Sequence, residues 1–112
     1  MRVYCDGSGW NGESSGYAIV FDSDTKPILI RNGENKTNNE REYEAVIEAA
    51  KMSFQAEIVT DSQLVVNQVN GSWKVKEIRL LHLCREAQRL IRENQCTLKW
   101  VRREENKAGF LF

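Results

Sequence analysis

The sequence predicts an α/β fold: a mixed sheet of five strands, three antiparallel and then two parallel, flanked by helices. Residues 1–33 hold three short segments rich in strand-forming side chains, separated by turn residues. Beyond Thr37 the apolar residues take helical spacing, and helical and strand-like segments then alternate. Short turns favour antiparallel pairing, whereas helices that connect successive strands favour parallel pairing. These two patterns together predict the mixed sheet.

The three N-terminal strands are expected at residues 3–6, 17–21 and 27–31. Gly7-Ser8-Gly9 is expected to stop the first strand, and the Asp-Ser-Asp-Thr stretch at residues 22–25 makes a good hairpin turn between the second and third. Three strands joined by short connections predict an antiparallel meander.

The first helix is expected to begin at Thr37, because Thr37 and Glu40 have the spacing of a capping box. The apolar stripe of this helix consists of Tyr43, Val46, Ile47, Ala50 and Phe54.

The rest of the chain alternates between the two kinds of element. A buried strand is expected at residues 56–60, and Asp61-Ser62 can cap a short helix at residues 63–69. A longer amphipathic helix is expected at residues 77–93 and a fifth strand at residues 97–101. Residues 102–112 are expected to form a polar loop with an apolar tail.

Length and composition predict a single domain spanning residues 1–112, with 41% hydrophobic and 29% charged residues. No apolar run approaches the roughly 20 residues that span a bilayer, so no membrane partner is expected. The three cysteines have no paired-ligand spacing, which argues against zinc or a disulfide framework and favours a cytoplasmic, reducing location. A monomer is the expected oligomeric state.

Net charge is zero, but its distribution along the chain is uneven. Residues 1–73 carry six Lys/Arg against eleven Asp/Glu, and residues 74–112 carry ten against five. An acidic half beside a basic half is compatible with a carboxylate site next to a phosphate-tracking surface. It is equally compatible with ordinary solvated helix faces.

Three carboxylates lie at junctions between expected elements. Asp6 ends the first strand, Glu42 lies in the first turn of the first long helix, and Asp61 ends the fourth strand. Acidic groups at converging chain ends can bind a hard cation such as Mg²⁺ through oxygen. Each also has a simpler explanation, since Glu42 would favour a helix N-terminus and Asp61 would serve as an N-cap. Spacing alone does not bring the three together.

Four motifs occur in order along the chain: Tyr4-Cys5-Asp6-Gly7-Ser8, Thr37-Asn38-Asn39-Glu40-Arg41-Glu42, Thr60-Asp61-Ser62-Gln63, and Trp100-Val101-Arg102-Arg103-Glu104-Glu105-Asn106-Lys107. With the predicted element order, the whole chain resembles ribonuclease H of type 1, particularly its short archaeal and bacterial members. The resemblance implies a ribonuclease H-like fold and an endonuclease that hydrolyses the RNA strand of RNA:DNA hybrids. It also implies that Asp6, Glu42 and Asp61 are catalytic, metal-binding carboxylates holding two Mg²⁺ or Mn²⁺ ions with substrate.

The same resemblance implies substrate contacts. Main-chain groups near Gly7 and Ser8, with Asn38, Asn39 and Gln63, would meet the RNA strand and its 2′-hydroxyls. Thr37 would help to hold a phosphate of the DNA strand. Trp73 with Lys74 and Lys76 would meet a sugar-phosphate backbone; alternatively Trp73 packs into the core and the lysines are merely solvated.

The chain departs from the family pattern near its C-terminus. The family carries a fourth carboxylate, an Asp four residues after the Asn of the last motif. Counting from Asn106 places Phe110 there, or Gly109 if one residue is deleted. Glu104 or Glu105 could substitute for this carboxylate. The residues after Asn106 are also too few for the family's last helix. Two alternatives therefore stay open: a catalytically impaired module that still binds nucleic acid, and a metal-dependent enzyme with another phosphodiester substrate.

Overall fold

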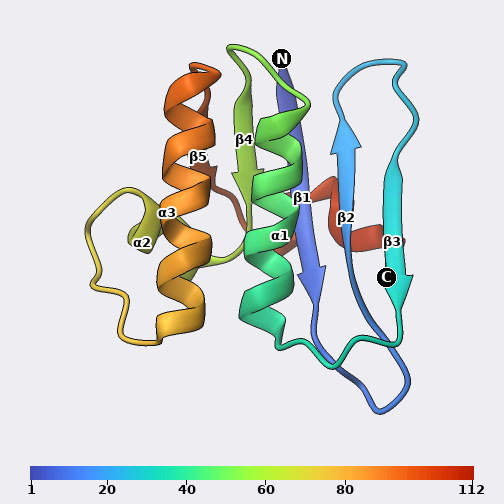
Figure 1. The fold of residues 1–112 in the computed structure, drawn as a ribbon. Coiled ribbons are helices and arrows are strands. Elements are labelled where there is room, and N and C mark those ends of the chain that lie inside the picture. Colours follow the sequence, from blue (N-terminus) through green and yellow to red (C-terminus); the bar gives the residue numbers. More distant parts are fainter.

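The five strands form one mixed sheet in the order β3-β2-β1-β4-β5 (Figure 1). The computed structural model describes all residues 1–112. Strand β1 pairs antiparallel with β2, and β2 pairs antiparallel with β3. On its other side β1 pairs parallel with β4, which pairs parallel with β5. The predicted sheet, three antiparallel strands followed by two parallel ones, is confirmed.

The strands are β1 (Arg2–Ser8), β2 (Ser15–Phe21), β3 (Ile28–Asn32), β4 (Glu57–Thr60) and β5 (Thr97–Trp100). The helices are α1 (Asn38–Lys51), α2 (Gln63–Val69) and α3 (Ile78–Glu93), followed by two 3₁₀ turns, η1 (Arg103–Glu105) and η2 (Lys107–Leu111). The expected elements are all present, with ends displaced by one or a few residues.

Strand β1 is longer than the sequence predicts. Gly7 and Ser8 do not stop it; they continue the ladder opposite Tyr17 and Gly16 of β2. Gly7 serves a different purpose, because a Cβ on this residue would lie 2.3 Å from the backbone nitrogen of Glu42. The missing side chain lets α1 approach β1 closely at this point. Asp6 consequently lies within the strand and not at its end.

Helix α1 begins with the predicted capping box. The Thr37 hydroxyl accepts a hydrogen bond from the Glu40 amide at 3.2 Å, and the Glu40 carboxylate accepts one from the Thr37 amide at 2.9 Å. The predicted stripe is wrong at its far end, because the helix stops at Lys51 and Phe54 is 60% exposed. The chain turns sharply there, with Gln55 in the left-handed region at φ 54°, and Phe54 is carried away from the core.

Helices α1 and α3 lie together over one face of the sheet (Figure 1). Between helices and sheet lies the main hydrophobic core, which includes the fully buried side chains of Val3, Ile19, Tyr43, Val46 and Ile58. This burial is the principal stabilising term for the fold.

The other face of the sheet is covered in part by the C-terminal residues. The expectation of a polar loop is wrong here, because residues 103–111 form two 3₁₀ turns and η2 packs against β1 and β2. Asn106 anchors them: its buried amide donates to the Cys5 carbonyl at 2.8 Å and accepts from the Ala108 amide at 3.2 Å. The C-terminal segment is thereby held directly behind the strand that carries Asp6.

All three cysteines are buried free thiols. None of the helices combines the length and the apolar character needed to cross a membrane.

Candidate metal centre

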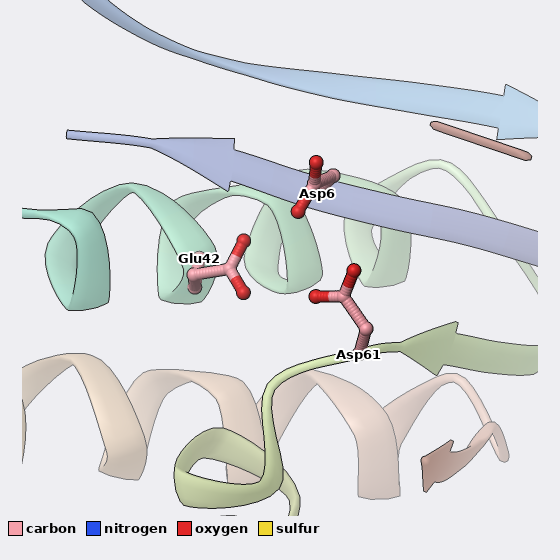
Figure 2. A group of neighbouring side chains, drawn as sticks. All are labelled: Asp6, Glu42 and Asp61. Carbon is pink, nitrogen blue, oxygen red and sulfur yellow. The ribbon is translucent and has the colours of Figure 1, made fainter. Parts of the chain in front are cut away.

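The three carboxylates converge at one end of the sheet (Figure 2). Asp6 comes from β1, Glu42 from α1, and Asp61 directly follows β4. One oxygen of each lies within 4.8 Å of an oxygen of the other two. A shared cation would require the carboxylates of Asp6, Glu42 and Asp61 to lie close together, and in the structure they do.

Strand pairing brings the two aspartates together. The parallel register of β1 and β4 places Cys5 beside Thr60, and each is followed by one of the aspartates. Parallel-paired strands run in the same direction, so the residues that follow this pair, Asp6 and Asp61, lie side by side. This proximity depends on the register alone and needs no specific side-chain contact.

Glu42 reaches the same point from the helix. The Gly7 amide donates a hydrogen bond to its carboxylate, which directs the side chain toward β1. Glu40, not Glu42, takes the acidic place in the capping box. The simpler explanation of Glu42 as a helix-end charge is therefore insufficient, since this side chain is buried and points into the cluster.

Asp61 is free of a capping role. The N-cap of α2 is Ser62, whose hydroxyl accepts a hydrogen bond from the Val65 amide at 3.2 Å. The Trp100 indole N–H donates to the Asp61 carbonyl at 3.1 Å and so fixes the backbone at this turn. One carboxylate oxygen of Asp61 is buried without any hydrogen-bond partner. A buried acceptor without a partner is costly, so it signals a missing cation or donor.

Crowding makes the cluster hold a proton. Burial, followed by the nearby charge of Asp6, raises the pKa of Glu42 to about 9. Burial and then the charge of Asp61 raise the pKa of Asp6, while the positive charge of Arg103 opposes that rise. Three carboxylates in one buried place cannot all ionise cheaply without a counter-charge.

The donor set fits a divalent cation. Carboxylate oxygens are the ligands that Mg²⁺ and Mn²⁺ prefer. A positive ion held by Asp6, Glu42 and Asp61 would supply the unpartnered oxygen of Asp61 with a partner and would relieve the mutual repulsion of the cluster.

The carboxylates lie in a polar pocket of about 250 Å³. Three of the residues that the sequence proposed for substrate contact, Gly7, Ser8 and Asn38, line it. Sequence reasoning missed the other members of its wall, namely Ser62, Arg103 and Phe112. Arg103 belongs to the fourth sequence motif. Membership of that motif was the only signal in the sequence that could have pointed to Arg103 as a residue of the site.

Comparison with known proteins identifies the family of this chain. The sequence model of the RNase H family matches residues 1–108. The chain belongs to the ribonuclease H family. The bifunctional protein Rv2228c of Mycobacterium tuberculosis is 36% identical over 110 residues, covering 89% of this chain. The chain spans only 30% of the length of that relative. A ribonuclease H of Ehrlichia chaffeensis is 31% identical over 117 residues, covering 89% of this chain and 80% of that protein.

Solved structures agree with this family. The N-terminal RNase H domain of Rv2228c from Mycobacterium tuberculosis, fused to maltose-binding protein, superposes with a TM-score of 0.78 at 32% identity. The match covers 94% of this chain and 84% of that one. LC11-RNase H1 in complex with an RNA/DNA hybrid superposes with a TM-score of 0.80 at 27% identity, covering 95% and 88%.

All but one of the remaining proposed contact residues of this chain line two further grooves. Thr37 lines one of them, together with Ser8 and Asn38. Asn39, Trp73 and Lys74 line the other, with Lys76. Trp73 is 49% exposed, so the alternative of a core residue is excluded. Gln63 is exposed beside Ser62 and lines neither groove.

Of the two positions that counting proposed for the family's fourth carboxylate, Gly109 lies beside the cluster. A Cβ on Gly109 would lie 3.5 Å from a carboxylate oxygen of Asp6. Phe110, the position obtained by direct counting, is 76% exposed and lines no part of the pocket. Glu104 and Glu105 are exposed and also lie outside the pocket wall, where Arg103 stands instead.

Proposed function

We propose that this chain hydrolyses the RNA strand of RNA:DNA hybrids with divalent metal ions, Mg²⁺ or Mn²⁺, held by Asp6, Glu42 and Asp61. One observation carries the proposal: three carboxylates from separate elements lie within 4.8 Å of one another in a member of the ribonuclease H family. The complex of LC11-RNase H1 with an RNA/DNA hybrid supports the choice of substrate.

The chain's own contribution is to arrange negative oxygens before substrate arrives. The register of β1 with β4 places Asp6 beside Asp61, and the Trp100 hydrogen bond fixes the backbone of Asp61. The hydrogen bond from the Gly7 amide directs Glu42 toward them. When bound, two ions would lower the pKa of the attacking water and stabilise the leaving oxygen. Binding them displaces the proton that Glu42 retains, because a ligating carboxylate must be ionised.

Substrate positioning falls to groups around the pocket. Gly7, Ser8 and Asn38 would contact the RNA strand and its 2′-hydroxyl, with Asn39 and Gln63 further along it. Thr37 would hold a phosphate of the DNA strand. Trp73 and Lys74 would contact a sugar-phosphate backbone in the groove that Asn39 also lines.

One observation favours a second candidate, a catalytically impaired nucleic-acid-binding module. Gly109, one of the two positions where the family's fourth carboxylate would be expected, lies beside Asp6 and carries no side chain that could bind a metal. A metal held by fewer protein oxygens binds more weakly, which would leave nucleic-acid binding with little or no cleavage.

A single experiment separates the two candidates. An end-labelled RNA:DNA hybrid is incubated with the protein in Mg²⁺, in Mn²⁺ and in EDTA, with Asp61→Asn as the matched variant. Cleavage of the RNA strand that needs metal and disappears in the variant is the expected result. Binding of the hybrid without cleavage in either metal would favour the impaired module, and equal cleavage of duplex DNA would indicate another phosphodiester substrate.

A further inference from the structure

A second groove adjoins the metal pocket and contains an exposed indole. Its volume is about 570 Å³, within the range of small-ligand sites. Trp10, in the connection between β1 and β2, is 39% exposed there. Ser8 and Asn38 line both this groove and the metal pocket, so the two hollows adjoin. We call it the Trp10 groove, lined by Ser8, Gly9, Trp10, Asn35, Lys36, Thr37 and Asn38.

The backbone that carries Trp10 is held on both sides. The Trp10 amide donates to the Lys36 carbonyl at 2.8 Å, and the Gly9 amide donates to the Asn38 side chain at 3.2 Å. A Cβ on Gly9 would lie 2.5 Å from the Asn38 nitrogen, so the loop is pressed against the start of α1. The next turn is closed by Asn11, whose side chain accepts from two amides at 2.9 Å. A backbone fixed in this way has little freedom left to lose when a ligand arrives, which lowers the cost of binding.

The chemistry of the groove matches a nucleotide better than an apolar partner. Trp10 is its single hydrophobic residue, and the rest of the lining is amide, hydroxyl, glycine and one ammonium group. A protein-binding hot spot would surround such a ring with further apolar side chains. The Lys36 ammonium is already paired with Glu34 and Glu44, each at 3.1 Å. Charge is thus largely balanced, and the ring is the main feature offered to a ligand.

We infer that the Trp10 groove binds one nucleotide of the hybrid beside the metal centre, with the indole packed flat against its sugar or base. Aromatic rings stack on nucleotides without regard to sequence. The inference rests on the proposed function, because it takes the substrate to be nucleic acid crossing the neighbouring pocket. It adds a residue that the four sequence motifs do not include.

The test compares Trp10→Ala with Trp10→Phe. Binding of a fluorescently labelled RNA:DNA hybrid is measured by anisotropy without divalent ions, and KM and kcat are measured in Mn²⁺. Trp10→Ala is expected to weaken binding about 5- to 150-fold, the range for loss of one stacked base. KM should rise with kcat nearly unchanged, and Trp10→Phe should keep most of the affinity. The dependence of affinity on salt should keep its slope, since no phosphate charge is removed.

Phe54→Ala is the matched control, because Phe54 is also an exposed aromatic residue but lies beyond the other end of α1. It should leave binding unchanged, and circular dichroism should show all variants folded. Wild-type binding by Trp10→Ala, or an equal loss in Trp10→Phe, would overturn the inference. If the wild-type protein bound the hybrid but did not cut it, only the hydrolysis would be refuted. If it did not bind at all, both proposals would fail.

Discussion

Replacing Asp61 by Asn should stabilise the metal-free protein while removing its metal-dependent activity. The carboxylate oxygens lie within 4.8 Å of one another, and two unit charges at this separation repel by about 3.5 kcal/mol at an effective dielectric constant of about 20. Glu42 retains its proton at neutral pH, so the repulsion is mainly between Asp6 and Asp61. Because the pocket opens to solvent, we expect a gain of about 1–3 kcal/mol in the free energy of unfolding.

The side-chain amide contributes in the same direction. Asn keeps the shape of Asp and brings two N–H donors to a place where one carboxylate oxygen now lacks a partner. A hydrogen bond to Asp6 would replace a repulsion by an attraction. The fold itself should be unaffected, since Ser62 caps α2 and the Asp61 carbonyl, which Trp100 contacts, is kept.

The assay is urea and thermal unfolding in EDTA at low salt, where the variant should melt about 4–10 °C above wild type. With Mn²⁺ at about 1,000 times its Kd the order should reverse, because binding then stabilises the wild-type protein by about 4.1 kcal/mol and the variant loses this gain. Asp24→Asn, at an exposed carboxylate in the turn between β2 and β3, is the control and should change neither value.

The reasoning would be refuted by a variant that is no more stable than wild type in EDTA and gains equally from Mn²⁺. Retained cleavage by Asp61→Asn would refute the assignment of Asp61 as a metal ligand.

Three further predictions concern pH, the fourth carboxylate and selectivity. The folded-state pKa of Glu42, about 9, lies above the value of 4.5 expected for an unfolded chain, so the metal-free protein should lose stability as pH rises from about 5 to 9. Metal affinity should rise over the same window by up to about tenfold per pH unit, and calorimetry in two buffers should detect the released proton, which Glu42→Gln should abolish. Activity should be low in Mg²⁺ and higher in Mn²⁺, and Gly109→Asp should raise the Mg²⁺-dependent rate whereas Phe110→Asp should not, because only Gly109 faces Asp6. That gain has a ceiling, since a misplacement of about 1 Å can cost on the order of 100-fold in rate; equal effects of the two substitutions would contradict the placement. Duplex DNA should not be cleaved, because recognition uses the 2′-hydroxyl of RNA. Affinity for the hybrid should fall with added salt, because binding uses phosphate contacts. Cleavage of duplex DNA, or filter binding of the hybrid that does not change with salt, would contradict these predictions.

Local rules predicted most of the fold. The Thr37–Glu40 capping box was correct in both of its hydrogen bonds, because both partners lie within one helical turn. Changes of period located the strands and helices to within a few residues, and the connections predicted which strands pair antiparallel and which parallel. The same rules failed where a distant element decides: Gly7 was expected to end β1, yet β2 extends the ladder past it.

The candidate site divides in the same way. The residue types and their order along the chain were enough to single out Asp6, Glu42 and Asp61, and the resemblance of four motifs was enough to name the family. That the carboxylates meet follows only from the register of β1 with β4 and from the close approach of α1 at Gly7. The raised pKa of Glu42 follows from that meeting, since burial and neighbouring charge are properties of the packed state.

The C-terminal residues depend most on tertiary structure. Counting along the sequence left Phe110 and Gly109 as alternatives, and only the 3₁₀ turns anchored by Asn106 place Gly109 against Asp6. The exposure of Trp10 and the position of its groove beside the metal pocket likewise have no signature in the sequence. Apart from the end of β1 and the C-terminal turns, sequence alone determined the secondary structure, the pairing sense and the candidate carboxylates, because these depend on short-range periodicity and on side-chain chemistry. Distances, protonation and exposure were decided only by the tertiary structure, because each depends on residues far apart in the chain.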